Sequence, residues 1–126
     1  MHKLKRGEIF KPLNDYYLLS NYGRVFSLYD FKILKPFLSN HGYLRIDLFL
    51  PEGRQRIMIH TEIVRIFGDK NGKHLPFQKL KELGLSIDHL NRNKFDNRPE
   101  NLEIVTHEEN CRRWKSIPDP EDCLPY

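Results

Sequence analysis

The sequence of 126 residues predicts a small α+β protein, with an N-terminal antiparallel sheet and short helix followed by a module of two strands and a helix. Three observations support this class. Residues 44–48 alternate between apolar and polar side chains, which is the period of a half-buried strand. A second strand-like segment, 54–59, follows directly after a Pro-Glu-Gly turn and indicates a hairpin. Residues 86–115 contain a strand, a polar loop, a second strand and a helix in that order.

We expect one compact domain overall, divided into four segments by turn residues and by changes in composition. Residues 1–68 form the sheet with its connecting helix, 69–85 a linker with a short helix, 86–117 the strand–strand–helix module, and 118–126 an acidic, proline-rich tail.

The hairpin has a register that can be predicted. A connection of two or four residues pairs Leu44 with Ile59, Ile46 with Ile57, and Asp47 with Arg56. The first two pairs are apolar and the third is a favourable charge pair on the opposite face, so the two faces agree on one register. We expect the apolar face to pack on a short helix that Gly68 ends. An earlier strand is expected at 24–28, after the turn at 20–23.

The C-terminal half contains a capped helix. Thr106 and Glu109 have the spacing of a capping box, which predicts a helix over 107–115 that stops before Pro118. The elements expected before it are a short helix within 76–83, a strand at 86–90, a polar loop at 91–100, and a strand at 101–105.

The charge is positive and unevenly distributed. The chain has 21 Lys and Arg against 17 Asp and Glu, and residues 1–65 hold eleven of the former against six of the latter. A basic half favours a polyanionic partner, most simply nucleic acid, although an ordinary basic surface is the alternative. The longest apolar runs are too short to span a membrane, and two cysteines are too few for a disulfide scaffold or a four-cysteine zinc site. We therefore expect a soluble intracellular protein.

The residues expected to contact DNA lie on the sheet and in the polar loop. A sheet whose outer face carries arginine can enter a DNA groove, although a solvated face is an equally good interpretation for any single arginine. For Lys94 and Arg98 in the loop, the alternative to a phosphate contact is an ion pair between Asp96 and Arg98. The candidates are Arg24, Arg45, Arg54, Arg56, Lys94 and Arg98; we place Tyr43 on the same outer face.

Four residues of the C-terminal module form a candidate catalytic site. Asp88 and Asn110 offer hard oxygen ligands, which suit Mg²⁺ or Mn²⁺, and leave most of an octahedral shell open. His89 has the unperturbed pKa of a general base near neutral pH. Asn101 is expected to pin the polar loop through its side-chain amide. In a regular strand Asp88 and His89 point to opposite faces, so we expect the strand to end or distort there.

The segment from Ile87-Asp88-His89-Leu90 through Asn101-Leu102-Glu103-Ile104 to Asn110 resembles the HNH, or ββα-metal, nuclease motif, in the form found in phage and intron-encoded homing endonucleases. Upstream, residues 8–28 are similar to the nuclease-associated DNA-binding segment of such enzymes, and 60–67 to the helix that joins the two parts. The resemblance covers about residues 8–110.

This resemblance implies a DNA endonuclease in which Asp88 and Asn110 bind one Mg²⁺ or Mn²⁺ ion per site, His89 activates water, and Asn101 orients His89 by holding the loop. The implied products carry 5′-phosphate and 3′-hydroxyl ends. The sequence departs from the family at three positions: Phe10 stands where Trp is usual, Thr61 where Arg is usual, and Asn110 where many relatives have histidine. We see no helix-turn-helix after Lys115, which larger relatives carry.

The sequence therefore predicts an HNH endonuclease that hydrolyses phosphodiester bonds in double-stranded DNA, with no membrane partner and no small-molecule substrate. We expect a monomer that nicks one strand, and a dimer remains the alternative. If phage-encoded, as the resemblance suggests, the protein acts in the cytoplasm of a bacterial host. The competing hypothesis is a non-catalytic DNA-binding or regulatory module whose HNH unit is structural or decayed. Cleavage of RNA is a third possibility.

Overall fold

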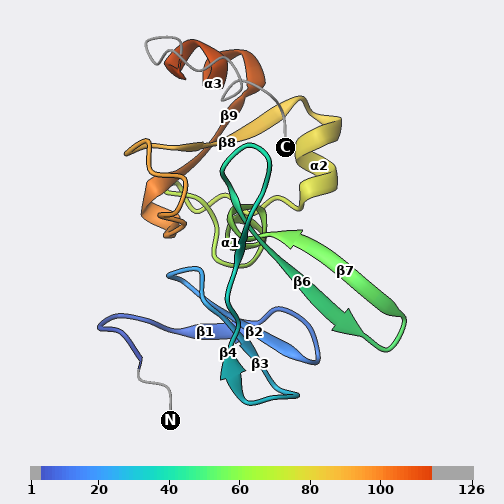
Figure 1. Ribbon diagram of the computed structural model, residues 1–126. Coiled ribbons are helices and arrows are strands. Elements are labelled where there is room, and N and C mark those ends of the chain that lie inside the picture. The colour runs from blue at the N-terminus through green and yellow to red at the C-terminus, as the bar shows by residue number, and fades with distance from the viewer. Residues whose placement is uncertain (1–3, 115–126) are drawn as a thin grey trace.

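A computed structural model describes residues 4–114 (Figure 1). The fold is α+β, as predicted. It begins with a four-stranded antiparallel sheet, in the order β1-β2-β3-β4, and continues with a three-stranded antiparallel sheet, in the order β5-β6-β7. The strands of these sheets are β1 (Phe10–Pro12), β2 (Tyr17–Ser20), β3 (Val25–Ser27), β4 (Lys32–Ile33), β5 (Phe37–Leu38), β6 (Leu44–Leu50) and β7 (Gly53–Met58).

The second half of the chain supplies the helices and a third sheet of two strands. The helix α1 follows β7 without a break and lies between the N-terminal sheet and the C-terminal module (Figure 1). The C-terminal module ends with a two-stranded antiparallel sheet on which the last helix packs. These elements are α1 (Ile59–Ile66), α2 (Phe77–Glu82), β8 (Leu85–His89), the 3₁₀ turn η1 (Pro99–Asn101), β9 (Leu102–Thr106) and α3 (His107–Trp114).

The N-terminal region contains two sheets where one was predicted. Arg24 precedes β3 in the first sheet, whereas Arg45, Arg54 and Arg56 belong to β6 and β7 of the second. The prediction of a common arginine-bearing face is therefore wrong for Arg24. The sequence signal for β1 and β4 is weak because these strands have only three and two residues.

The β6–β7 hairpin has the predicted register over most of its length. Ile46 pairs with Ile57 and Asp47 with Arg56, and two residues connect the paired Leu50 and Gly53. Ile59, however, begins α1, and Leu44 pairs with Leu38 of β5. The predicted pair of Leu44 and Ile59 is wrong because the chain turns into the helix one residue earlier. Arg56 also reaches Asp47 through its Nε, at 3.1 Å from Oδ1.

One hydrophobic core connects the two halves. Its members come from the first sheet, the hairpin, one side of α1, α2 and the C-terminal module. The most deeply buried are the aliphatic side chains of Leu19, Val25, Leu48, Ile59, Ile63, Val64, Leu80 and Leu102. Burying one such side chain contributes about 1.5–3 kcal/mol, so α1 is held mainly by its contacts rather than by its eight-residue length. Gly68 ends this helix with a φ of 92°, as predicted.

Two polar contacts fasten the C-terminal module to the rest. The carboxylate of Asp69, which is buried, accepts hydrogen bonds from the backbone N–H groups of Asn71, Lys73 and Ile104. The Nζ of Lys94 donates to the carbonyl of His41, at 2.8 Å, and joins the polar loop to the β5–β6 connection. These contacts fix the loop against the sheet. No helix among residues 4–114 is long and apolar enough to cross a membrane.

The predicted helix at 107–115 corresponds to α3, whose N-terminus is capped by Thr106. The backbone N–H of Glu109 donates to Thr106 Oγ1, at 3.1 Å. The side chain of Glu109 instead binds Arg112 and Arg113. Lys115 and the tail at 118–126 lie outside the described residues.

Candidate active site

Asp88 lies on β8 with its side chain completely buried against α3. Its Oδ1 accepts hydrogen bonds from Arg92 Nη1 at 2.8 Å and from Trp114 Nε1 at 2.9 Å. Its Oδ2 accepts one from Arg113 Nη1 at 2.9 Å. Two guanidinium groups thus neutralise this buried carboxylate, which would otherwise be very costly to keep ionised.

Asn110 lies one turn before Arg113 and Trp114 on α3. Residues three and four apart share one helix face, so Asn110 is on the face that contacts Asp88. Its side chain is 6% exposed, and its Oδ1 is buried without a hydrogen-bond partner. A buried carbonyl oxygen without a partner carries an energetic penalty and indicates a missing ligand.

The donor set fits a hard divalent cation. A carboxylate oxygen of Asp88 and the amide oxygen of Asn110 are ligands that Mg²⁺ and Mn²⁺ prefer, and the unpartnered Oδ1 is available. Among residues 4–114 no cluster of three His, Cys, Asp or Glu side chains has the geometry of a metal site. The candidate site consists instead of one carboxylate and one amide.

His89 is the last residue of β8 and is 1% exposed. Its Nε2 lies 2.7 Å from Asn97 Oδ1, and because an amide oxygen can only accept, Nε2 donates and the lone pair is on Nδ1. Burial lowers the pKa of His89 below its usual 6.5, although the hydrogen bond to Asn97 partly opposes this effect. The imidazole is therefore neutral at pH 7 and able to accept a proton.

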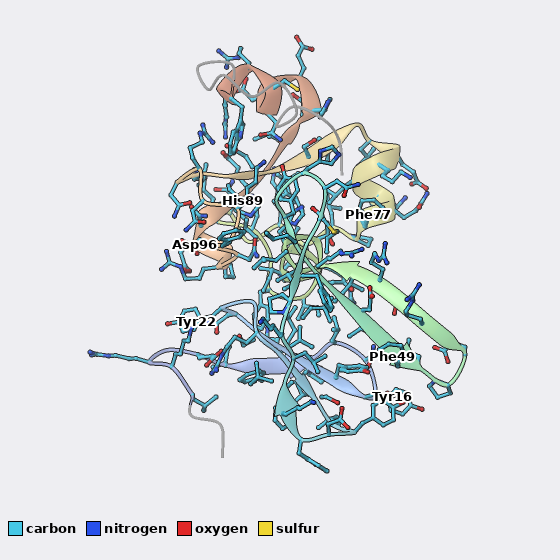
Figure 2. The ribbon with its side chains drawn as sticks, viewed as in Figure 1. Tyr16, Tyr22, Phe49, Phe77, His89 and Asp96 are labelled. Carbon is cyan, nitrogen blue, oxygen red and sulfur yellow. The ribbon has the colours of Figure 1, made fainter. Side chains whose placement is uncertain are left out.

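The ring of His89 packs in a small aromatic cluster. The rings of Tyr43 and His60 are stacked with their centroids 4.8 Å apart, and each lies within 6 Å of the His89 ring, at 5.7 and 5.4 Å. Tyr43 is only 7% exposed, so its predicted place on the solvent-facing side of the sheet is wrong. His89 lies near the middle of the molecule, on the side of Asp96 and away from Phe77 (Figure 2).

The predicted distortion of β8 is not what brings Asp88 and His89 to one site. The ladder with β9 is regular through both residues, with Asp88 opposite Glu103 and His89 opposite Leu102. The two side chains leave the strand on opposite sides, one toward α3 and the other toward Tyr43 and His60. The strand ends there, and the loop that follows folds back over both sides.

Two cations of this loop link the two sides. Arg92 Nη1 contacts both Asp88 Oδ1 and the carbonyl of His89, at 2.8 and 3.1 Å. Lys94 Nζ lies 4.8 Å from the centroid of Tyr43 and 5.4 Å from that of Trp114. Tyr43 packs on His89 and Trp114 bonds Asp88, so the ammonium of Lys94 lies near the aromatic neighbours of both candidate residues.

Asn101 holds the polar loop as predicted from its residue type. Its Oδ1 accepts from the backbone N–H of Asn91, and its Nδ2 donates to Asn91 Oδ1 and to the carbonyl of Asp96. The direct contact with His89, however, comes from Asn97 within the same loop. Sequence reasoning did not single out Asn97, because the loop contains several asparagines and only the folded loop distinguishes them.

Arg113 and Trp114 were also missed, although a signal existed. Both follow Asn110 at the three- and four-residue spacing that places them on its helix face. Arg92 carries no comparable signal, because its position depends on the loop conformation, in which φ is +66°.

The predicted DNA-binding residues fall into two groups. Arg24 and Arg98 are engaged in ion pairs: Arg24 contacts the buried carboxylate of Glu8, and Arg98 contacts Asp96 through two nitrogens at 2.8 Å. For Arg98, the alternative of a loop ion pair is the one seen. The second group is associated with the β6–β7 hairpin. Arg45, Arg54 and Arg56 lie on its strands, and Lys94 lies next to it because its Nζ bonds the carbonyl of His41.

The outer face of the hairpin is basic and hollowed. The register places Arg45 opposite Met58, Asp47 opposite Arg56, and Phe49 opposite Arg54 on that face. Arg45 and Arg56 line a hollow of about 480 Å³ together with His41. Arg45 Nε and His41 Nδ1 are buried beside this hollow without a hydrogen-bond partner in the protein.

Comparison with known proteins identifies the class to which this fold and site belong. Residues 65–112 match the HNH endonuclease family; this range runs from the last two residues of α1 to most of α3. Residues 8–49 match the NUMOD4 motif. Two parts of the chain thus match the HNH endonuclease family and the NUMOD4 motif, and the chain is related to phage homing endonucleases.

Among its relatives are two phage proteins. H-N-H endonuclease F-TflII of Escherichia phage T5 is 32% identical over 104 residues, which are 81% of this chain and 50% of the relative. DNA endonuclease I-HmuI of Bacillus phage SP01 is 31% identical over 106 residues, which are 84% of this chain and 55% of the relative. This chain thus spans about half the length of these relatives.

The fold is also similar to a solved structure described as DNA binding and cleavage by the HNH homing endonuclease I-HmuI. The TM-score is 0.70 at 28% sequence identity, and the match covers 86% of this chain and 58% of the other.

Proposed function

We propose that this chain is a divalent-metal-dependent DNA endonuclease that hydrolyses phosphodiester bonds and, as a monomer, nicks one strand of double-stranded DNA. The observation that carries the proposal is the arrangement around β8: a buried carboxylate, an unpartnered amide oxygen on the facing helix, and a neutral histidine with a fixed tautomer at the end of the same strand. DNA as the substrate is supported by one relative, I-HmuI, which is named a DNA endonuclease and whose solved structure is described as DNA binding and cleavage.

Asp88 and Asn110 are the residues proposed to hold Mg²⁺ or Mn²⁺. Bound there, the cation supplies stabilisation of the negative charge that develops on the phosphate and on the leaving oxygen. The amide oxygen of Asn110 has no hydrogen-bond partner and is ready for this role. The carboxylate of Asp88, in contrast, already accepts hydrogen bonds from Arg92, Arg113 and Trp114. Arg113 and Trp114 position the carboxylate from α3.

His89 is proposed to be the general base. A water molecule gives one proton to His89 Nδ1 as its oxygen forms a bond to phosphorus, and the bond from phosphorus to the 3′-oxygen breaks. The products are a 5′-phosphate and a 3′-hydroxyl, the latter after the leaving oxygen takes up a proton. Asn97 Oδ1 accepts the hydrogen bond from His89 Nε2–H throughout and so stabilises the imidazolium that forms.

DNA is proposed to bind across the outer face of the β6–β7 hairpin and the polar loop. Arg45, which lines the hollow, and the exposed Arg54 offer guanidinium donors to phosphate oxygens, and Lys94 continues this basic surface to the candidate active site. Arg24 and Arg98 contribute through their ion pairs to the shape of the surface. One candidate site per chain supports nicking, because concerted cleavage of both strands needs a second site.

The test is the relaxation of supercoiled plasmid by the full chain with Mg²⁺, with EDTA, and with two variants. The wild type with Mg²⁺ should convert supercoiled plasmid to open circles, and EDTA should stop it. His89→Ala should lower the rate by about 10²-fold or more, because the loss of a general base removes that much. His74→Ala is the matched control, since His74 is an exposed histidine in a loop after α1.

The outcomes separate the hypotheses. Equal rates for His89→Ala and the wild type contradict the assignment of the base. Intact plasmid in the presence of a gel shift supports the alternative of a non-catalytic DNA-binding module. Linear product appearing before open circles contradicts nicking by a monomer. A single-stranded RNA substrate cut faster than DNA contradicts the choice of DNA as substrate.

A further inference from the structure

We propose that Arg92 is a replaceable cation: it neutralises Asp88 in the metal-free protein, is displaced when a divalent cation binds Asp88 and Asn110, and then binds a phosphodiester of the DNA. The inference rests on the proposed function, because it concerns the same metal and substrate. It adds a coupling between metal binding and DNA binding through one side chain.

The carboxylate of Asp88 is nearly saturated with donors. A carboxylate offers about four lone-pair positions, and Arg92, Trp114 and Arg113 occupy three of them. Two of these donors carry a full positive charge. A divalent cation bound to the same buried carboxylate would lie close to both guanidinium groups, and at low effective dielectric this repulsion is strong. One of the two cations is expected to leave.

Arg113 is anchored and Arg92 is not. Arg113 also contacts the carboxylates of Glu103, at 2.7 Å, and Glu109, at 2.9 Å, so three acids hold it in place. Among the described residues, Asp88 is the acid that Arg92 contacts, and its remaining hydrogen bond is to the carbonyl of His89. The Arg92 side chain is 34% exposed, so it can move into solvent without crossing the core.

The backbone at Arg92 gives a second, independent observation. Its φ of +66° lies in the left-handed region, which a residue with a Cβ adopts at a cost, and among residues 4–114 Phe31 is the other non-glycine residue with a positive φ. Glycine or asparagine would relieve this strain. The conformation of the loop, rather than a local preference of arginine, therefore places this side chain beside Asp88.

Arg92 lies beside a second cation of the polar loop, so the two can bind one phosphate together. The Arg92 guanidinium is 4.9 Å from the centroid of Trp114, and the ammonium of Lys94 is 5.4 Å from the same ring. Both cations therefore lie against the aromatic ring that bonds Asp88. The planar guanidinium can donate two parallel hydrogen bonds to phosphate oxygens, which makes arginine suited to this ligand.

Metal binding can be measured without cleavage because the chain has a single tryptophan, which bonds Asp88 and lies under Arg92. The experiment follows Trp114 fluorescence and calorimetry while Mn²⁺ or Mg²⁺ is added to the full chain without DNA. Arg92→Asn, whose new side chain tolerates a positive φ, should bind the metal about tenfold more tightly than the wild type, because the competing cation is gone.

Arg112→Gln is the matched control for charge. Arg112 is next to Arg113 on α3 and contacts Glu109, so its replacement removes one charge near the site without touching Asp88. The affinity of this variant for the metal should stay within about twofold of the wild type, because exposed charges are screened. Arg92→Gly provides a second variant, and a thermal melt shows that each one is folded.

The coupling to DNA is measured in a His89→Ala background, so that the DNA stays intact. With Mg²⁺, adding Arg92→Asn should weaken DNA binding about tenfold and lower the salt slope of log K by about 0.9, the value of one phosphate contact. With EDTA the same substitution should change DNA affinity by less than about twofold, because Arg92 is then engaged by Asp88.

The failures are distinguishable. Equal or weaker metal affinity in Arg92→Asn overturns the inference and leaves the proposed function standing. The same loss of DNA affinity with Mg²⁺ and with EDTA also overturns it, since Arg92 would then act independently of the metal. An absence of metal binding by the wild type and by both Arg92 variants overturns the proposed metal site, and the inference with it.

Discussion

Single hydrogen bonds decide the chemistry of His89. A buried imidazole has two nitrogens, and the partner of one sets the role of the other. Asn97 Oδ1, at 2.7 Å from Nε2, fixes the neutral tautomer that has its lone pair on Nδ1. Burial keeps the pKa of His89 below its usual value, so the imidazole is neutral at neutral pH, as the proposed general base must be.

Asn97 is therefore expected to act as a positioning residue. Asn97→Ala should lower the cleavage rate about 10- to 100-fold, as loss of an outer-shell partner of histidine commonly does. Asn97→Asp should raise the pKa of His89, because a carboxylate stabilises the imidazolium, and should move the acidic limb of the pH–rate profile to higher pH. Asn71→Ala, in a loop after α1, is the control. Unchanged pH profiles for both Asn97 variants would contradict this role.

At the scale of elements, the β6–β7 hairpin separates two tasks between its faces. The inner face carries Ile46, Leu48 and Ile57, which belong to the core. The outer face carries the arginines and the exposed Phe49. Because side chains alternate along a strand, changes on the outer face leave the packing of the inner face intact. The DNA-binding role can therefore be tested without unfolding the protein.

Arg54→Gln should weaken DNA binding several-fold and reduce the salt slope of log K by about 0.9, because one phosphate contact is lost. The measurement is a fluorescence anisotropy titration at several salt concentrations. Lys79→Gln is the matched control, since Lys79 lies on the exposed side of α2, where it pairs with Glu82. Equal slopes for Arg54→Gln and wild type would remove this face of the hairpin from the proposed DNA interface.

At the scale of the whole molecule, the buried interior and the candidate site meet at His60. His60 lies on α1 within the core, is 1% exposed, and is stacked on Tyr43 next to His89. Burial lowers the pKa of His60 well below its usual 6.5, and the neighbouring His89 contributes to this effect. Protonation of these rings is thus opposed in the folded state and free in the unfolded state.

This difference predicts that acid destabilises the protein. Above pH 6.5 both states hold His60 neutral; below it the unfolded state binds more protons, so the free energy of unfolding falls as the pH falls. His60→Phe keeps a ring and removes this titration. Between pH 6.5 and 5 the free energy of unfolding of the wild type should fall more steeply than that of His60→Phe, by up to about 1.4 kcal/mol per pH unit. Urea unfolding at four pH values measures both slopes, and parallel curves would contradict the assignment.

The part of the fold that the sequence predicts is the part with strong local signals. The β6–β7 register follows from the alternation around Ile46 and Asp47, and the start of α3 from the cap at Thr106. The division of the N-terminal strands into two sheets carries no such signal, because β4 and β5 have two residues each. Short strands are held by pairing with distant segments rather than by their own composition.

By itself, the sequence named the candidate residues of the site, Asp88, His89, Asn101 and Asn110, from residue type, spacing and family resemblance. Only the tertiary structure decided which groups surround them. Asn97 reaches His89, and Arg92 and Arg113 reach Asp88, through a loop and a helix that return to the end of β8. The physical reason is that a buried charge or imidazole is governed by neighbours a few ångströms away, and chain folding, not sequence order, selects those neighbours.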